Sequence, residues 1–530
     1  MATYATKPAW ELGARAPVRA RIAVPLGLGV LVLLSAYVRT RNAGVGFWID
    51  EGLSVGIAGR PLTDIPGVLR QDGSPPLYYV LVHLWMPLAG DSEAATRALS
   101  LLFGLLCVPV AWWGGRLVLG ARTGWMAAML AAANPFVTQY AQETRMYALV
   151  ALLGLVAVIC WLQAFVAAPP AGGGVRVRAA IGVAAAFAAM LYTHNWAAFL
   201  GLGTVAALLV VAALAGAAER RRLLRTALVA YGGAAALYLP WLPTLLYQAT
   251  HTGAPWSNPP DLADLAEVPA RLLGETAEIA LALAAGAGLV AILARREERR
   301  LGAPARMVIA LAVIGVACVV AAWLSSQLTP AWAPRYLAAA LPPFLLLAAA
   351  GLGHAGRLGI AGLVLAVALS AGADRPPREK SNVRDVAEAV APSLRPGDLV
   401  VATQPEQVPV LAYYLPGGVR FATLTGEVRD LGVTDWRDGV ERLRRTSAER
   451  DLAPLLDALA PGRRLALVQP IVYDLKPWSA PWTELVRLRS EEWGQFVSTD
   501  RRFGATKQAP ASVFPRRPNP VRATVYLKTG

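Results

Sequence analysis

The sequence predicts a polytopic α-helical membrane protein with about 11 transmembrane helices, followed by a C-terminal extracytoplasmic α/β domain. Three observations support this prediction. The 530 residues are 56% hydrophobic and only 16% charged, whereas a soluble domain has about 25% charged residues. Apolar runs of helix length succeed one another up to residue 373, and residues 374–530 contain none. We therefore expect a transmembrane domain over 1–373 and a soluble domain over 374–530.

Each apolar run is close to the roughly 20 residues with which an α-helix crosses the hydrocarbon core of a bilayer. The first run follows a basic N-terminus and continues past the length of a signal-peptide core, so we expect it to be retained. The predicted spans are 21–39, 95–118, 123–140, 145–167, 179–193, 197–218, 226–246, 273–294, 306–324, 336–353 and 358–373.

The formal net charge of +15 would suit a nucleic-acid-binding protein only if Lys and Arg were clustered on a soluble scaffold. They gather instead at the N-terminus and in alternate loops between the spans, such as 219–225 and 295–306. The positive-inside rule places these loops and the N-terminus in the cytoplasm, and an odd number of spans puts the tail outside. We expect a multi-pass protein of the plasma (inner) membrane that contacts the lipid bilayer and no nucleic acid.

Apolar runs typical of strands alternate with helical runs in the tail, which predicts a small α/β domain. No glycine-rich fingerprint follows the first strand, so nucleotide binding is not supported. The expected strands are 399–403, 419–424, 464–472 and 521–528, and the expected helices are 405–415, 438–459 and 481–497.

The outer loop over 40–94 begins with Trp-Ile-Asp-Glu-Gly at 48–52. Adjacent carboxylates near a membrane surface, here Asp50 and Glu51, are solvated, paired or functional. Asp50 either caps the N-terminus of a helix or takes a proton from an attacking hydroxyl. The residues by themselves leave both interpretations open.

The same loop continues through Asp72 and Tyr78. Its apolar residues at helical spacing predict two short helices within 60–85, broken by a Pro-Pro pair and lying along the membrane surface. Interfacial anchoring explains the aromatic residues, but it leaves Asp72 unexplained.

Three later outer turns carry further candidates, which are Glu143, Arg145, His194, Arg335 and Tyr336. Glu143 and Arg145 form either a local ion pair or a functional pair opposite Asp50. His194 is either structural or functional, and Arg335 either snorkels or holds a phosphate with its planar fork. All of these residues fall at the outer ends of spans. Carboxylates and cations on one face indicate transfer from a phosphate-activated, membrane-bound donor.

In these motifs the chain resembles the GT-C superfamily of polyprenyl-phosphate-sugar-dependent glycosyltransferases. It is most similar to the branch of protein O-mannosyltransferases, lipid A aminoarabinose transferases and RgtA-to-D-like enzymes. The motifs are WIDEG at 48–52, DGSPPLYYVLVHLW at 72–85, QETRMYALVALL at 142–153, YTHNW at 192–196 and PRYL at 334–337.

The resemblance implies a GT-C transmembrane module and a sugar donor on a polyprenyl monophosphate. Asp50 would be the general base that activates the acceptor hydroxyl, with Glu51 completing the acidic pair, and attack would invert the anomeric centre. Arg335 would hold the lipid phosphate, helped by Arg145 or His194. The other expected residues of the donor and acceptor site are Asp72, Glu143, Tyr78 and Tyr336.

Glu143 matches the second acidic motif of metal-dependent relatives, but it lacks a DxD pattern. We therefore expect no required cofactor, while Asp50 and Glu143 are the residues that would hold a divalent cation if one is used. The expected acceptor is extracytoplasmic and is a cell-envelope glycan, a lipid or a protein. The alternatives are a transporter or flippase, a non-catalytic envelope scaffold with an outer binding domain, and an oligosaccharide ligase that uses a diphosphate lipid.

Overall fold

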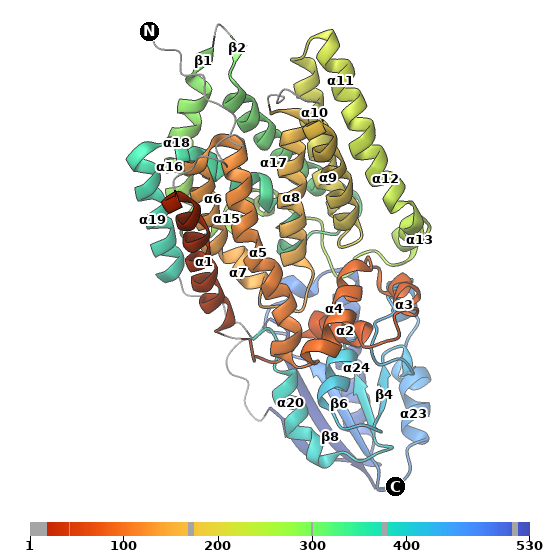
Figure 1. Cartoon of the computed structure of the whole chain (residues 1–530). Helices are drawn as coiled ribbons and strands as arrows, with labels where there is room; N and C mark the ends of the chain where they lie inside the picture. The colour runs from red at the N-terminus through yellow and green to blue at the C-terminus, as the bar shows by residue number, and fades with distance from the viewer. Residues whose placement is uncertain are drawn as a thin grey trace.

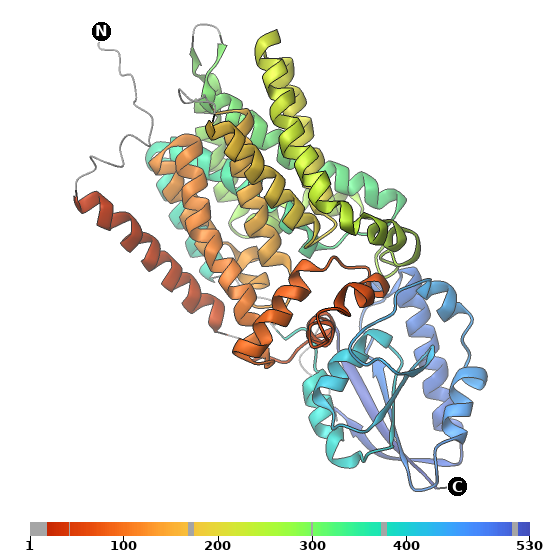
Figure 2. The same cartoon turned by 45° about the vertical axis from the view of Figure 1, so that its right-hand side comes forward.

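The computed structural model describes residues 18–41, 43–167, 174–297, 300–372, 379–510 and 518–529. A bundle of helices leads into a smaller α/β domain, and three short helices lie between the two (Figure 1). The first helix, α1, runs along the outside of the bundle (Figure 2). The boundary expected at residues 373 and 374 falls outside the described residues.

The bundle is built from apolar helices joined by short turns. Its α-helices are α1 (Val18–Thr40), α5 (Glu93–Leu119), α6 (Ala121–Ala133), α7 (Pro135–Tyr140), α8 (Tyr147–Phe165), α9 (Gly174–Leu191), α10 (Ala197–Ala213), α11 (Ala217–Ala227), α12 (Gly233–Tyr238), α13 (Leu242–His251), α14 (Leu262–Ala266), α15 (Val268–Leu273), α16 (Glu278–Ala294), α17 (Ala303–Leu328), α18 (Leu341–His354) and α19 (Gly356–Gly372). Its other elements are the π-helix η2 (Leu228–Gly232), the 3₁₀-helices η3 (Leu239–Trp241) and η4 (Pro334–Ala339), and the hairpin of β1 (Arg296–Glu297) and β2 (Arg300–Leu301).

Every predicted span contains helix, and several of them, the third, the seventh and the tenth among them, contain more than one helical element. The third span breaks at Asn134, whose side chain accepts a hydrogen bond from the Val137 amide and caps α7. Among the described residues, five helical segments are long and apolar enough to cross a membrane. They are Ile22–Thr40, Glu93–Leu117, Tyr147–Phe165, Ala217–His251 and Ala303–Leu328. The chain therefore has the helices of a membrane protein, and the count of about 11 crossings stays a prediction.

The outer loop folds into α2 (Ile49–Ala58), α3 (Ile65–Asp72) and α4 (Leu77–Ala89). The last two occupy the segment in which two short helices were expected, and α2 is additional. The chain leaves α3 through Gly73, whose φ of +95° is left-handed, and a Cβ there would lie 2.8 Å from Thr252 Oγ1. Glycine therefore allows the turn into α4.

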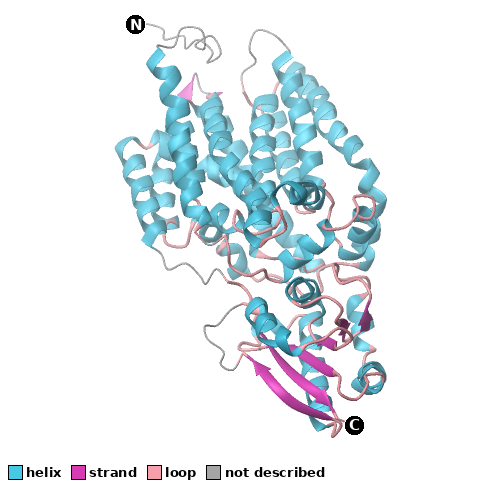
Figure 3. Ribbon diagram, turned by 60° about the horizontal axis from the view of Figure 1, so that its bottom comes forward, coloured by secondary structure: helices cyan, strands magenta, loops and turns pink. Residues whose placement is uncertain are grey.

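The C-terminal domain is a six-stranded sheet with helices on both faces (Figure 3). Its strand order is β5-β4-β3-β6-β8-β7, with β3 parallel to β4 and β6 and the other pairings antiparallel. The strands are β3 (Leu399–Ala402), β4 (Arg420–Thr423), β5 (Gly426–Val428), β6 (Arg464–Pro470), β7 (Phe503–Ala509) and β8 (Val521–Lys528). The helices are α20 (Val383–Val390), η5 (Ala391–Ser393), η6 (Pro405–Gln407), α21 (Val408–Tyr414), α22 (Gly439–Arg444), η7 (Ala448–Leu452), α23 (Ala453–Asp457), η8 (Lys476–Trp478) and α24 (Pro481–Thr499).

Alternation along β3 explains the two covered faces. Val400 packs in one apolar cluster with residues of α20 and α21, whereas Val401 packs in another with residues of α24. Successive side chains of a strand point to opposite faces, so a fully apolar strand needs cover on both sides. The four expected strands correspond to β3, β4, β6 and β8. The edge strands β5 and β7 were not expected: β5 has only three residues and none is buried, and β7 is mostly exposed and shows no apolar pattern.

The C-terminal domain rests directly on α2. A Cβ at Gly52 would lie 2.6 Å from Val410 Cβ, and one at Gly56 would lie 2.7 Å from the backbone of Gly432. Two glycines one helical turn apart thus let the backbone of α2 approach the domain closely. The helix that carries Asp50, α2, is packed between the bundle and the sheet domain (Figure 1).

Candidate functional site

Asp50 lies in the first turn of α2 and faces two arginines. Its Oδ2 is 3.8 Å from Arg145 Nε and 3.8 Å from Arg335 Nε. All three atoms are buried and have no hydrogen-bond partner. The side chain does not cap α2, and Trp48 occupies the cap position. The carboxylate and the two guanidinium groups are therefore close together, and each has one buried polar atom without a hydrogen bond. A ligand that carries negatively charged oxygens could bind to the two arginines.

Arg145 is fixed by hydrogen bonds on its other side. Its Nη1 donates to Ser54 Oγ at 3.1 Å, to the Asp50 carbonyl oxygen at 3.2 Å and to Tyr79 OH at 3.5 Å. These contacts tie the arginine to α2 and α4 and leave Nε toward the Asp50 carboxylate. The guanidinium is thus positioned by the outer loop rather than by its own turn.

Arg335 is fixed by aromatic rings. Its guanidinium carbon lies 4.9 Å from the ring centre of Trp256, 5.4 Å from that of Tyr336 and 5.8 Å from that of Trp48. Cation–π contacts hold a charge without consuming its N–H donors. Arg335 therefore keeps donors free for an anion.

His194 lies near Arg145 and Arg335 but is itself a neutral group. Burial, followed by the charges of Arg145 and Arg335, lowers the pKa of His194 to about 3. Its Nδ1 accepts a hydrogen bond from the Trp196 amide at 3.1 Å, so the proton of the neutral ring is on Nε2. Its ring centre is 4.6 Å from that of Tyr336. The ring can offer one N–H donor and no charge.

Glu51 is turned away from this cluster. Its Oε1 accepts from Arg97 Nε at 2.8 Å and from the Thr144 amide at 2.8 Å, and its Oε2 accepts from Arg97 Nη2 at 2.7 Å. The Glu51 side chain is 1% exposed, against 18% for Asp50. Both oxygens of Glu51 accept hydrogen bonds. Glu51 therefore fixes the first turn of α2, which carries Asp50, to Arg97 and to the turn at Thr144.

Arg97 extends that anchor to the start of the outer loop. It also donates to the carbonyl oxygens of Ala43, Val45 and Gly46. The bidentate pair with Glu51 therefore joins α5, the entry to α2 and the turn at Thr144. Sequence reasoning missed Arg97. A charge inside the first turn of an apolar span was the signal that could have found it.

Glu143 already has a cation beside it. Lys380, at the start of the C-terminal domain, places Nζ 2.5 Å from Glu143 Oε1 and 4.2 Å from the ring centre of Trp48. Burial raises the pKa of Glu143, and Lys380 opposes that effect. Within the ranges that the structure describes, no three His, Cys, Asp or Glu side chains are grouped to hold a metal ion.

Asp72 and Tyr78 lie on the outer-loop side of the site. Tyr78 is buried, and its hydroxyl is 2.8 Å from Ser100 Oγ on α5. Burial raises the pKa of Asp72 to about 6, while hydrogen bonding from Ser74 and the charge of Arg145 act in the opposite direction. Tyr78 therefore links α4 to α5 of the bundle. Asp72 is a buried acid whose charged form is disfavoured by its surroundings.

We expect Asp72→Asn to stabilise the protein at high pH only. Asp72 holds its proton more tightly in the folded chain, with a pKa of about 6 against an ordinary value of 3.8, so stability falls as the pH rises through this interval. Above it, the amide should recover on the order of 1–3 kcal/mol. The measurement is the unfolding temperature at about pH 8 and about pH 4. The exposed neighbour Asp64→Asn is the control, and an equal effect of Asp72→Asn at both pH values would contradict the prediction.

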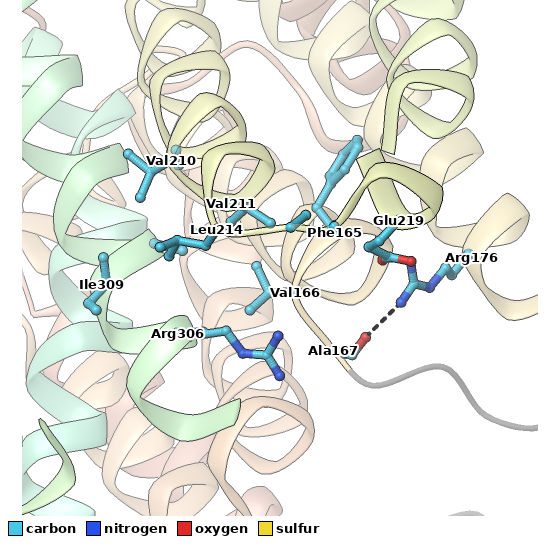
Figure 4. A pocket seen from close by; sticks show the side chains of 14 residues that line it. Phe165, Val166, Ala167, Arg176, Val210, Val211, Leu214, Glu219, Arg306 and Ile309 are labelled. Carbon is cyan, nitrogen blue, oxygen red and sulfur yellow. Dashed lines mark hydrogen bonds and ion pairs between the residues drawn. The ribbon is translucent and has the colours of Figure 1, made fainter. Parts of the chain in front are cut away.

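A cavity of about 350 Å³ lies elsewhere, among the ends of α8 and α10 and the starts of α9, α11 and α17 (Figure 4). It is lined by apolar side chains, by Arg306 and by the ion pair of Arg176 and Glu219. The Nη1 atom of Arg176 is 2.9 Å from Oε1 of Glu219. It contains none of the residues around Asp50.

No protein-family model and no curated protein matches the sequence. Solved structures do match. The apo crystal structure of ArnT from Cupriavidus metallidurans has a TM-score of 0.62 at 15% identity, over 96% of this chain and 98% of that chain. The chain has the GT-C fold. The GT-C resemblance expected from the motifs is confirmed at the level of the fold, and it extends beyond them through the C-terminal domain.

Further GT-C structures agree. ArnT bound to undecaprenyl phosphate has a TM-score of 0.59 at 14% identity, over 96% of this chain and 98% of that chain. The apo oligosaccharyltransferase from Archaeoglobus fulgidus has a TM-score of 0.54 at 12% identity, over 92% of this chain and 73% of that chain.

Proposed function

We propose that the chain is an integral membrane inverting glycosyltransferase of the GT-C type. It would move a sugar from a polyprenyl-monophosphate donor to an extracytoplasmic acceptor, with Asp50 as general base. The observation that carries the proposal is the Asp50 carboxylate beside Arg145 and Arg335, both with an unpartnered Nε. The solved ArnT structure with undecaprenyl phosphate supports the donor class, since that protein shares the fold.

The proposed chemistry needs one base and one anion site. The acceptor hydroxyl attacks the anomeric carbon and gives its proton to Asp50, while the bond from that carbon to the phosphate oxygen breaks. The electron pair leaves with polyprenyl phosphate, whose charge Arg335 and Arg145 neutralise and to which the Nε2–H of His194 donates. Attack opposite the leaving group inverts the anomeric centre. The two arginines thus act on the departing phosphate, and Asp50 acts on the arriving hydroxyl.

We also propose that no divalent cation is required. The Lys380 ammonium lies against Glu143, where a metal ion would otherwise balance this carboxylate. We further place the site and the C-terminal domain outside the cytoplasm, as the positive-inside rule predicts.

The direct test uses the purified full chain in nanodiscs with radiolabelled polyprenyl-phosphate sugars and envelope extract. We expect release of free polyprenyl phosphate that depends on Asp50. We also expect the labelled sugar on the acceptor, with the configuration at its anomeric carbon inverted relative to the donor. Parallel reactions contain a polyprenyl-diphosphate oligosaccharide. Turnover of that donor alone would make the protein an oligosaccharide ligase. Movement of labelled lipid across the bilayer without bond cleavage would make it a flippase.

We expect Arg335→Ala to lower kcat by roughly 10²–10³-fold, the usual cost of removing one donor to a developing anion. Arg335→Lys should recover only part of the loss, because lysine keeps the charge and lacks the fork. Arg271→Ala, on an exposed helix face, is the matched control. The measurement is steady-state release of polyprenyl phosphate, and full activity of Arg335→Ala would contradict the assigned role.

A further inference from the structure

A buried acid of the C-terminal domain lies beside the site. Glu406 belongs to η6, which follows β3 and packs directly on α2. In open α/β sheets, ligands bind outside the carboxyl ends of the parallel strands. Here the segment after the parallel strand β3 reaches the outer-loop helices, since η6 contacts α2. The ligand edge of the sheet therefore faces the helix that carries Asp50.

One oxygen of Glu406 has no partner. The side chain is 7% exposed, its Oε1 accepts a hydrogen bond from Trp482 Nε1 at 2.6 Å, and its Oε2 is buried without a hydrogen bond. Burial raises the pKa of Glu406 to about 7, hydrogen bonds from Trp482 and the backbone oppose this, and the charge of Asp50 raises it further. A buried carboxyl oxygen left without a hydrogen bond is unfavourable, so a ligand that hydrogen-bonds to it recovers part of this free energy.

Three tryptophans lie between Glu406 and Arg335. The ring of Trp482 lies 5.1 Å from that of Trp436, centre to centre, and the half-buried Trp256 packs against the same apolar cluster. Trp256 in turn lies over Arg335 at 4.9 Å. Half-buried indole rings near a carboxylate present an apolar face and an acceptor together, which is what a sugar ring with its C–H face and its hydroxyls requires.

The side from which Glu406 approaches decides what it would bind. The prenyl chain of a lipid donor must lie with the bundle, whereas η6, which belongs to the sheet domain, contacts α2. Glu406 belongs to the domain on the far side of α2 from the bundle, so the acceptor is the substrate that its position suits.

We propose that Glu406, with Trp436 and Trp256, forms a subsite for a carbohydrate acceptor, in which an acceptor hydroxyl donates to Glu406 Oε2. This rests on the proposed transferase function. Glu406 is then a positioning residue that orients the acceptor toward Asp50. The acceptor would be a glycan or the sugar headgroup of a glycolipid, and a peptide would lack the hydroxyl-rich ring that the subsite fits.

The test is a kinetic comparison on the full chain with polyprenyl-phosphate sugar as donor and a panel of methyl glycosides and short oligosaccharides as acceptors. Glu406→Gln is nearly isosteric and keeps an acceptor for Trp482, so it preserves the packing. We expect it to raise the KM of the saccharide acceptor about 10- to 100-fold, with donor KM and slow hydrolysis of the donor by water unchanged. Glu484→Gln, exposed on the helix that carries Trp482, is the control.

Each result decides the proposal. An unchanged acceptor KM in Glu406→Gln, or a parallel loss of donor hydrolysis and of unfolding temperature, would reduce Glu406 to a structural role. Transfer to peptides and to none of the saccharides would also overturn it. In both cases the wild-type protein still releases polyprenyl phosphate, so the proposed function survives. Absence of that release in the wild type overturns the function and the subsite together.

Discussion

Replacing Asp50 by Asn is expected to leave the fold and donor binding intact and to lower turnover by about 10²–10⁴-fold, the usual contribution of a general base. The amide has the shape of the carboxylate but cannot take the proton of an acceptor hydroxyl. Asp50 is suited to that task because it is more exposed than Glu51, at 18% against 1%, and its Oδ2 is committed to no hydrogen bond.

The Asp50→Asn measurement separates binding from chemistry. Release of labelled polyprenyl phosphate reports turnover, and retention of labelled donor on the purified protein reports binding. Donor binding should persist or tighten, because the amide removes a negative charge that lies 3.8 Å from both Arg145 Nε and Arg335 Nε. The control is Asp64→Asn, an exposed acid of the same loop. Near-normal transfer by Asp50→Asn would refute the general-base assignment.

Removing Arg97 is expected to destabilise the protein by about 3–5 kcal/mol, the usual cost of leaving one charge of a buried pair without its partner. Arg97 and Glu51 are 3% and 1% exposed and share two charge-assisted hydrogen bonds. Arg97→Ala also releases the carbonyl oxygens of the loop before α2. The variant should therefore lose activity through misplacement of Asp50.

Chemical unfolding in mixed micelles measures the loss, and a double variant identifies its cause. Combining Arg97→Met with Glu51→Leu removes both charges, so it should be more stable than Arg97→Ala alone. The surface pair of Arg271 and Glu267, 44% and 52% exposed, provides the comparison, because Arg271→Ala should change stability by only about 0–1 kcal/mol. Wild-type stability of Arg97→Ala would show that the buried pair is not the anchor of α2.

The cluster of Asp50, Arg145 and Arg335 was accessible from sequence because all three follow from one topological rule. Positive charge orients the helices, and charged residues at the opposite helix ends must then share one face of the membrane. Asp50 and Arg145 are 95 positions apart in the sequence, Arg145 and Arg335 are 190 apart, and Asp50 and Arg335 are 285 apart. No further sequence signal is needed to group them once they share that face.

Arg97, Lys380 and Glu406 were not accessible in this way. Arg97 lies within an apolar span, and its partner Glu51 is 46 positions away. Lys380 and Glu406 come from the tail, where charged residues are common and periodicity only reports strands and helices. Their places depend on how the sheet domain sits on α2, which no local pattern encodes. For the same reason Glu51 looked equivalent to Asp50 in sequence, although consecutive helical residues point in different directions.

The close contact of Gly52 with Val410 and of Gly56 with Gly432 limits how this protein can be rebuilt. Side chains larger than hydrogen at either glycine would force the two halves apart, and the first turn of α2 would move with them. A chimera that joins the helical half of one relative to the sheet domain of another must therefore carry a matched pair of surfaces. We expect active chimeras among those in which α2 and the surface of the sheet domain that it contacts come from the same parent protein.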